Sequence, residues 1–181
     1  MNSEGMIDLR SDTVTEPTSE MRKVMLAAKV GDDVYAEDPT VNRLESVLAE
    51  MTGMQSGLFM PSGTQSNLVA LMSHCARGDE YIVGQQAHTY KYEAGGAAVL
   101  GAIVPQPLDF NEAGELDLEQ VKAAIKPADH HFANTRLLVL ENTMQGKVLS
   151  LDYLGAAVQF CAQHDLAIHL DGARAFNAAV A

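Results

Sequence analysis

The sequence predicts an α/β fold in which helices cover both faces of a mostly parallel sheet. Short apolar runs alternate with amphipathic helical runs along most of the chain. The connections between the apolar runs are long enough for crossovers, which favour parallel pairing. With 181 residues, 47% of them hydrophobic, the chain can bury one sizeable core.

The first well-marked element is a helix over residues 39–52. Pro39 suits the first helical position and Gly53 suits the position after the last turn. Apolar residues recur between them at helical spacing: Val41, Leu44, Val47, Leu48 and Met51. A short strand over 56–60 and a second helix over 67–78 are predicted to follow.

The same alternation continues in the second half of the chain. We expect strands over 80–84, 102–108, 136–143 and 166–174. We expect helices between and after them over 89–101, 116–126, 150–165 and 173–181. The last helix has no residue that would close it, which is unusual for the end of a domain; the alternative is a frayed terminal helix.

Composition argues against several classes of partner. Twenty-four acidic residues against 12 basic ones give a net charge of −12, which disfavours nucleic acid and anionic membrane surfaces. The start of the sequence lacks the features of a signal peptide, and no apolar run is long enough to span a bilayer. Cys75 and Cys161 lie in apolar stretches and are expected to be reduced. We therefore expect a soluble, cytoplasmic protein.

Ligands of open α/β sheets bind beyond the carboxyl ends of the strands. Gly63 and Thr64 lie where the strand predicted over 56–60 hands over to the next helix, so free N–H groups and hydroxyls there can donate hydrogen bonds to a phosphate. The alternative is a simple helix cap made by Ser62 or Thr64.

Two further candidates follow predicted strands. Asp171 ends a strand that is otherwise apolar, and Arg174 lies three residues later. The alternative is an aspartate that caps the next helix, with Arg174 at the surface. His88 comes just after the strand over 80–84, and its alternative is a partly exposed loop histidine.

Six segments carry a resemblance to one family: SDT, GDDVYAEDPTVNRLE, PSGTQSN, QAHTYKYEAGGAAVLG, LENTMQGKV and HLDGARAFNA. In order and spacing they resemble the low-specificity threonine aldolases, which are pyridoxal phosphate (PLP) enzymes of fold type I. The resemblance runs from Ile7 to Ala181. It implies the large domain of the aspartate aminotransferase fold, with an N-terminal arm over 1–16 and a partial PLP-binding domain over 17–181.

The resemblance also implies roles for particular residues. Gly63 and Thr64 would bind the cofactor phosphate, His88 would stack on the ring, and Asp171 would pair with the ring nitrogen. Arg174 and Ser11 would meet the substrate carboxylate. His131 matches a position near the substrate hydroxyl, although it also fits a solvated loop histidine beside His130. His88, His131 or a water molecule remain open as the base.

The implied activity is cleavage of L-threonine or L-allo-threonine to glycine and acetaldehyde, in a homotetramer or homodimer with no metal. Met144 and Gln145 replace the family's usual His-Asn pair, so the preference at the β-carbon stays open. Alternatives are another PLP-dependent β-carbon lyase and a non-catalytic remnant.

The family's Schiff-base lysine and small domain would lie beyond Ala181. None of the six lysines matches that lysine's position: Lys23, Lys29, Lys91, Lys122, Lys126 and Lys147. We therefore expect the 181-residue chain alone to bind PLP weakly and not to cleave threonine.

Overall fold

The computed structural model describes residues 7–180, which form two compact units. The first unit is Met1–Phe59 and the second is Met60–Ala181. The N-terminal arm over 1–16 and the PLP-binding domain over 17–181 stay predictions. Within residues 7–180, no helix has the length and apolar character needed to cross a membrane.

The first unit contains the helix predicted over 39–52. Its elements are η1 (Asp12–Val14), α1 (Ser19–Ala27), η2 (Asp33–Tyr35) and α2 (Pro39–Thr52). Asp38 caps α2, because its Oδ1 accepts hydrogen bonds from the N–H groups of Thr40 (2.9 Å) and Val41 (3.0 Å). Gly53 ends the helix in the left-handed conformation, with φ of 68°. The predicted boundaries of this helix are confirmed.

The strand predicted over residues 56–60 does not form. The N–H of Phe59 donates to Oε1 of Glu45 (2.7 Å), a side chain of α2, instead of pairing with a strand. Leu58 is 73% exposed, so this apolar run is not buried as a sheet strand would be. The prediction was wrong because an apolar run makes a strand only where a sheet edge can receive it.

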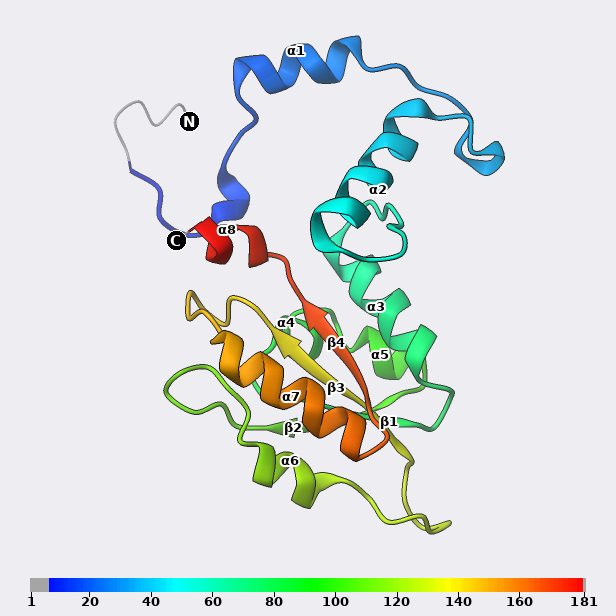
Figure 1. Ribbon diagram of the computed structural model, residues 1–181, viewed down its shortest axis with the longest axis vertical. Helices are drawn as coiled ribbons and strands as arrows, with labels where there is room; N and C mark the ends of the chain where they lie inside the picture. Colours follow the sequence, from blue (N-terminus) through cyan, green and yellow to red (C-terminus); the bar gives the residue numbers. More distant parts are fainter. Residues whose placement is uncertain (1–6, 181) are drawn as a thin grey trace. The chain divides into compact units, whose positions relative to one another are not determined.

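The second unit is built on a four-stranded sheet in the order β2-β1-β3-β4, with every pair parallel (Figure 1). The strands are β1 (Glu80–Gly84), β2 (Val104–Leu108), β3 (Thr135–Glu141) and β4 (Ala167–Asp171). β2 contains Pro105 and Pro107, which lack a backbone N–H, and it lies at an edge of the sheet, where such residues are tolerated.

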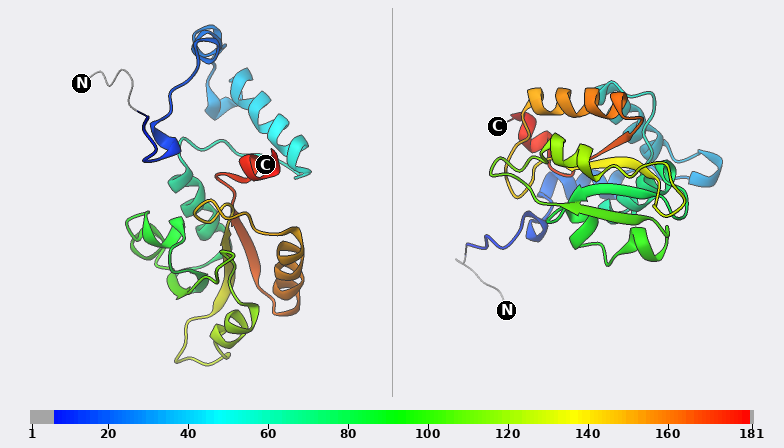
Figure 2. Two further views of the ribbon diagram at one scale, coloured as in Figure 1. Left: turned by 90° about the vertical axis from the view of Figure 1, so that its left-hand side faces the viewer. Right: turned by 90° about the horizontal axis from the view of Figure 1, so that it is seen from below.

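Helices cover both faces of this sheet, as predicted (Figure 2). On one face, Tyr81 and Val83 of β1 pack in one buried cluster with Leu71 of α3 (Gly63–His74). On the other face, Ile82 packs with Phe160 of α7 (Leu151–Gln163). The remaining helices of this unit are α4 (His88–Lys91), α5 (Gly96–Val99), α6 (Leu118–Ala124) and α8 (Ala175–Val180). Successive residues of β1 therefore point into two different cores.

The single helix predicted over 89–101 is instead the pair α4 and α5. Ala94 and Gly95 separate the two helices with φ values of 53° and 67°, in the left-handed region. Two consecutive left-handed residues interrupt the hydrogen bonding of a right-handed helix. This break places Glu93 in a bend between α4 and α5 rather than on a continuous helix.

Candidate active site

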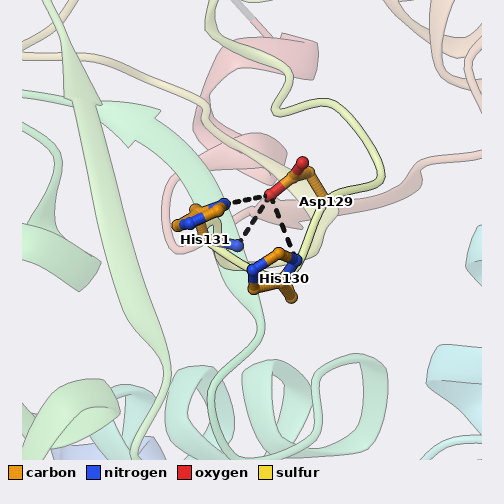
Figure 3. Close-up of side chains that lie close together, drawn as sticks. All are labelled: Asp129, His130 and His131. Atoms are coloured by element: carbon orange, nitrogen blue, oxygen red, sulfur yellow. Dashed lines mark hydrogen bonds and ion pairs between the residues drawn. The ribbon is translucent and has the colours of Figure 1, made fainter.

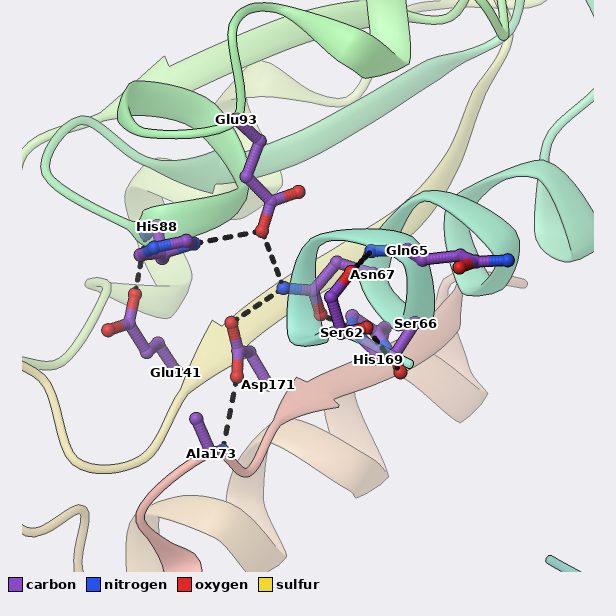
Figure 4. Close-up of polar contacts among 10 residues, drawn as sticks. All are labelled: Ser62, Gln65, Ser66, Asn67, His88, Glu93, Glu141, His169, Asp171 and Ala173. Carbon is purple, nitrogen blue, oxygen red and sulfur yellow. Dashed lines mark hydrogen bonds and ion pairs between the residues drawn. The ribbon is translucent and has the colours of Figure 1, made fainter. Parts of the chain in front are cut away.

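The carboxyl ends of β1, β3 and β4 meet at one edge of the sheet, where several polar side chains gather (Figure 4). His88 follows β1 at the start of α4, Glu141 ends β3, and Asp171 ends β4. Asn67, one turn inside α3, lies among them. Of these residues, the sequence predicted His88 and Asp171, and the structure brings the two together.

Asp171 is a buried carboxylate, with 8% of its surface exposed. Its Oδ2 accepts a hydrogen bond from Nδ2 of Asn67 (2.8 Å), and its Oδ1 accepts one from the N–H of Ala173 (3.1 Å). Both of these donors are neutral. A buried carboxylate held by neutral donors retains capacity for a cationic hydrogen-bond donor, which would offset the loss of hydration.

Asn67 connects three of the surrounding side chains. Its Nδ2 donates both to Glu93 Oε1 and to Asp171 Oδ2, each at 2.8 Å. Its Oδ1 accepts from Nε2 of His169 at 2.9 Å. Burial lowers the pKa of His169, which favours a neutral ring. Because the Oδ1 atom of Asn67 can only accept a hydrogen bond, the proton of this ring lies on Nε2. The amide of Asn67 is thus held from both ends.

His88 is bound at two points by carboxylates. Its ring Nδ1 lies 2.9 Å from Glu93 Oε1, and its backbone N–H donates to Glu141 Oε2 at 2.7 Å. The His88 side chain is 47% exposed, whereas the Glu93 side chain is 4% exposed. One atom each from His88, Glu93 and Asp171 lies within 4.8 Å of the other two. The imidazole of His88 is therefore half-exposed, whereas the carboxylate of Glu93 that binds it is buried.

Glu141 is shifted toward its neutral form. Burial is the main cause of its raised pKa, and the negative charge of Asp171 adds to the effect. The hydrogen bond from the His88 backbone and the charges of His88 and Arg174 act in the opposite direction. Arg174 is half-buried and lies close enough for its charge to act on this edge of the sheet.

Gly63 and Thr64 begin α3, four residues before the start predicted at Asn67, and the helix ends at His74 rather than at Gly78. Ser62 caps the helix, since its Oγ accepts from the N–H of Gln65 at 3.2 Å, so the cap proposed as the alternative is present. The cap nevertheless leaves the N–H groups of Gly63 and Thr64 without an acceptor in residues 60–180. A Cβ added at Gly63 would have nothing within 4 Å, so the surface in front of the helix start is open. These two N–H groups are available to an anion.

His131 lies elsewhere in the same unit. It is in the loop that precedes β3, where its Nδ1 lies 2.6 Å from Oδ1 of Asp129 and its ring is tilted by 39° against that of His130 (Figure 3). Seven residues of β3 separate this loop from the carboxyl edge, a distance of about 23 Å along the strand. Within one chain the structure does not bring His131 to His88 and Asp171, and its role near the substrate hydroxyl stays a prediction.

Ser11 belongs to the first unit and is described there alone. Its Oγ accepts a hydrogen bond from the N–H of Thr13 (3.2 Å) and caps η1. The predicted contact with a substrate carboxylate stays a prediction.

Sequence reasoning missed Asn67, Glu93, Glu141 and His169. Two of them had a recognisable signal. Asn67 lies four residues after Gly63, so the two share one face of α3. His169 lies two residues before Asp171, so both point to the same face of β4.

Comparison with known proteins agrees with the motifs. The family model described as beta-eliminating lyase matches residues 8–181. The chain is 60% identical over 176 residues to the low specificity L-threonine aldolase of Escherichia coli K12, covering 97% of this chain and 53% of that protein. It is 44% identical over 181 residues to low-specificity L-threonine aldolase 1 of Arabidopsis thaliana, covering 97% of this chain and 51% of that protein.

The chain thus spans about half the length of the curated relatives it matches. A solved structure of a Leishmania major threonine aldolase superposes with a TM-score of 0.54 at 24% identity, over 60% of this chain and 32% of that one. At that identity the likeness establishes the fold only, an α/β domain with a parallel sheet.

Proposed function

This chain belongs to the beta-eliminating lyase family, and from that premise we propose that its carboxyl-edge site binds PLP for the cleavage of L-threonine or L-allo-threonine to glycine and acetaldehyde. Members of the family depend on PLP. The observation that carries the proposal is Asp171, a buried carboxylate that accepts hydrogen bonds only from the neutral donors Asn67 and Ala173 among the contacts described above.

The residues at this edge fit the cofactor's chemical groups. Asp171 would accept a hydrogen bond from a protonated pyridine nitrogen, which supplies the missing positive charge. The free N–H groups of Gly63 and Thr64 would donate hydrogen bonds to the phosphate. His88, half-exposed above its buried carboxylate, would face the ring. When bound, PLP supplies an electron sink for the carbanion left at the substrate Cα.

Arg174 would orient the substrate. A planar guanidinium binds a carboxylate through two parallel hydrogen bonds, which fixes the rotation of the amino acid about its Cα. Only the bond aligned with the cofactor's π system breaks readily, so the grip of Arg174 would select the Cα–Cβ bond. Ser11 is proposed as a second contact for the same carboxylate.

A base must also accept the proton of the β-hydroxyl as acetaldehyde leaves. Among the imidazoles of one chain, His88 lies at the carboxyl edge and His131 does not. We therefore propose His88, directly or through a water molecule, for this step.

A second candidate is β-elimination on another amino acid, which the description of the matching family favours. The two reactions release different products, because cleavage of threonine gives glycine and acetaldehyde whereas β-elimination from serine or cysteine gives pyruvate and ammonia. Assaying both product pairs on a panel of amino acids separates them.

The test of the proposed function uses the protein expressed from its complete reading frame. With PLP and L-threonine we expect glycine and acetaldehyde in equal amounts, and we expect Asp171→Asn to lose most of this activity. Release of pyruvate without acetaldehyde would replace the aldolase assignment by the elimination. Failure of that protein to bind PLP at all would overturn both.

The amino-acid substrate class is consistent with the threonine aldolases that the chain resembles. A homodimer or homotetramer and a cytoplasmic location remain predictions. Light scattering on the complete protein measures its subunit number directly.

A further inference from the structure

We propose that Glu93 is the positioning residue of His88: it holds the imidazole in the tautomer with the proton on Nδ1 and, through Asn67, fixes that ring relative to Asp171. The value of this arrangement to the enzyme rests on the proposed function, but the arrangement itself can be measured without it.

The contact between Glu93 and His88 has the geometry of a carboxylate–imidazole pair. Glu93 Oε1 lies 2.9 Å from His88 Nδ1, and the Glu93 side chain is 4% exposed (Figure 4). A buried carboxylate has few water molecules to bond to, so its hydrogen bond to the ring is hard to replace. The ring of His88 is consequently anchored at one edge and open at the other.

This contact decides which ring nitrogen carries the proton. An ionised carboxylate only accepts hydrogen bonds, so the proton between the two groups belongs to Nδ1. In the neutral ring, Nε2 then keeps its lone pair. A histidine in this state can accept a proton at Nε2, which is what the proposed cleavage requires of a base.

Asn67 extends the support to the second carboxylate. One amide nitrogen bridges Glu93 and Asp171, with 2.8 Å to each. The amide cannot shift toward one partner without leaving the other, and its oxygen is held by His169 at 2.9 Å. His88, Glu93, Asn67 and Asp171 therefore form one hydrogen-bonded chain, which fixes the spacing between the two proposed cofactor contacts.

Other groups near His88 do not hold its ring in this way. Glu141 accepts from the backbone N–H of His88, not from the imidazole. Tyr92 packs with a distance of 5.7 Å between ring centroids, and Lys91 bonds to Gln86. Glu141 therefore offers a matched control: it is a carboxylate that touches the same residue without touching the ring.

The experiment compares the wild type with Glu93→Gln and Glu141→Gln in the complete protein. The ¹⁵N chemical shifts of the His88 ring report the tautomer, and a PLP titration reports affinity. We expect the Nδ1–H tautomer in the wild type and in Glu141→Gln. In Glu93→Gln we expect a mixture of the two His88 tautomers, because the carboxamide can donate as well as accept a hydrogen bond. We expect PLP affinity to fall about 10- to 100-fold in Glu93→Gln, because a hydrogen bond to a charged group is weakened.

Far-UV circular dichroism would show whether the isosteric variant folds. A wild-type ring with its proton on Nε2 would overturn the proposal whether or not the variant folds. So would a tautomer that is unchanged in folded Glu93→Gln, or one that changes equally in both variants. If the wild type shows the Nδ1–H form but binds no PLP, the proposed function fails while the positioning role of Glu93 stands.

Discussion

At the scale of the residue, Asp171 carries the strongest constraint on what this edge of the sheet can bind. The residue is 8% exposed, and its carboxylate accepts hydrogen bonds from Asn67 and the N–H of Ala173. Evolution of such a site toward stability alone would favour an apolar side chain, since burying an incompletely paired charge costs free energy. A cationic ligand atom would pair with this carboxylate and offset the cost of burying its charge.

Replacing Asp171 by Asn keeps the size of the side chain and removes the charge. We expect PLP affinity to fall about 10- to 100-fold, because a charge-assisted hydrogen bond is lost. Equilibrium titration with PLP measures this. Asp165→Asn is the matched control, since the Asp165 side chain is fully exposed and pairs only loosely with Arg136 at 3.9 Å. Equal affinities for the two variants would contradict the role of Asp171.

Glu141 makes a prediction about pH. Burial raises its pKa above the usual 4.5, so the folded chain binds this proton more tightly than the unfolded chain does. The linkage relation then makes its contribution to stability fall as the pH rises through 4.5 and up to the folded-state pKa. Glu141→Gln cannot ionise, so it should gain stability relative to the wild type over that range. Urea unfolding across this pH range measures the difference in the free energy of unfolding. A wild type that becomes more stable relative to the variant as the pH rises would contradict the prediction.

The sequence predicted His88, Asp171 and Gly63 because each directly follows a strand or turn with a clear signal. It missed Glu93, because its partnership with His88 depends on the break at Ala94 and Gly95, which periodicity does not show. His131 lies away from this edge in one chain, because its segment precedes β3 and so meets the opposite end of that strand.

At the scale of the element, helix termini account for most of what could be predicted. The limits of α2 follow from the cap at Asp38, Pro39 in the first turn and Gly53 after the last. Where no cap or breaker marks an element, prediction was poorer: residues 56–60 form no strand because no sheet edge receives them. The parallel sheet itself was predictable, since alternation and crossover length determine it.

Removal of the α2 cap tests that explanation. Asp38 accepts three backbone hydrogen bonds, from Gly31, Thr40 and Val41. Asp38→Ala should lower the free energy of unfolding by about 1 kcal/mol. Urea denaturation measures the loss. Asp33→Ala, an exposed position in the same unit, should change stability by less than about 0.5 kcal/mol. Similar losses in both variants would argue against capping.

A substitution at Gly63, the first residue of α3, can distinguish a structural role of this glycine from a role in binding PLP. A Cβ at Gly63 meets nothing within 4 Å, so Gly63→Ala should leave the fold intact and could raise stability by about 0.4–1 kcal/mol. The same methyl group would lie at the proposed phosphate site and should weaken PLP binding. Thermal unfolding and PLP titration of one variant test both parts. Reduced stability with unchanged affinity would assign Gly63 to the fold alone.

At the scale of the whole molecule, six ordered motifs indicated the family before any geometry was known, and the match over residues 8–181 agrees with them. The structure adds the contacts between these motifs. It joins His88 to Asp171 through Glu93 and Asn67, and it separates both from His131. The division into two units at Phe59 and Met60 was not predictable, because no change of composition marks it.

The central claim is that the carboxyl edge of this sheet is a PLP site for threonine cleavage. The most direct measurement is the product balance of the protein expressed from its complete reading frame, assayed with PLP and L-threonine. The account predicts one glycine and one acetaldehyde for each threonine consumed, with loss of both in Asp171→Asn and retention of both in Asp165→Asn. Threonine consumption without acetaldehyde, or full activity in Asp171→Asn, would contradict it.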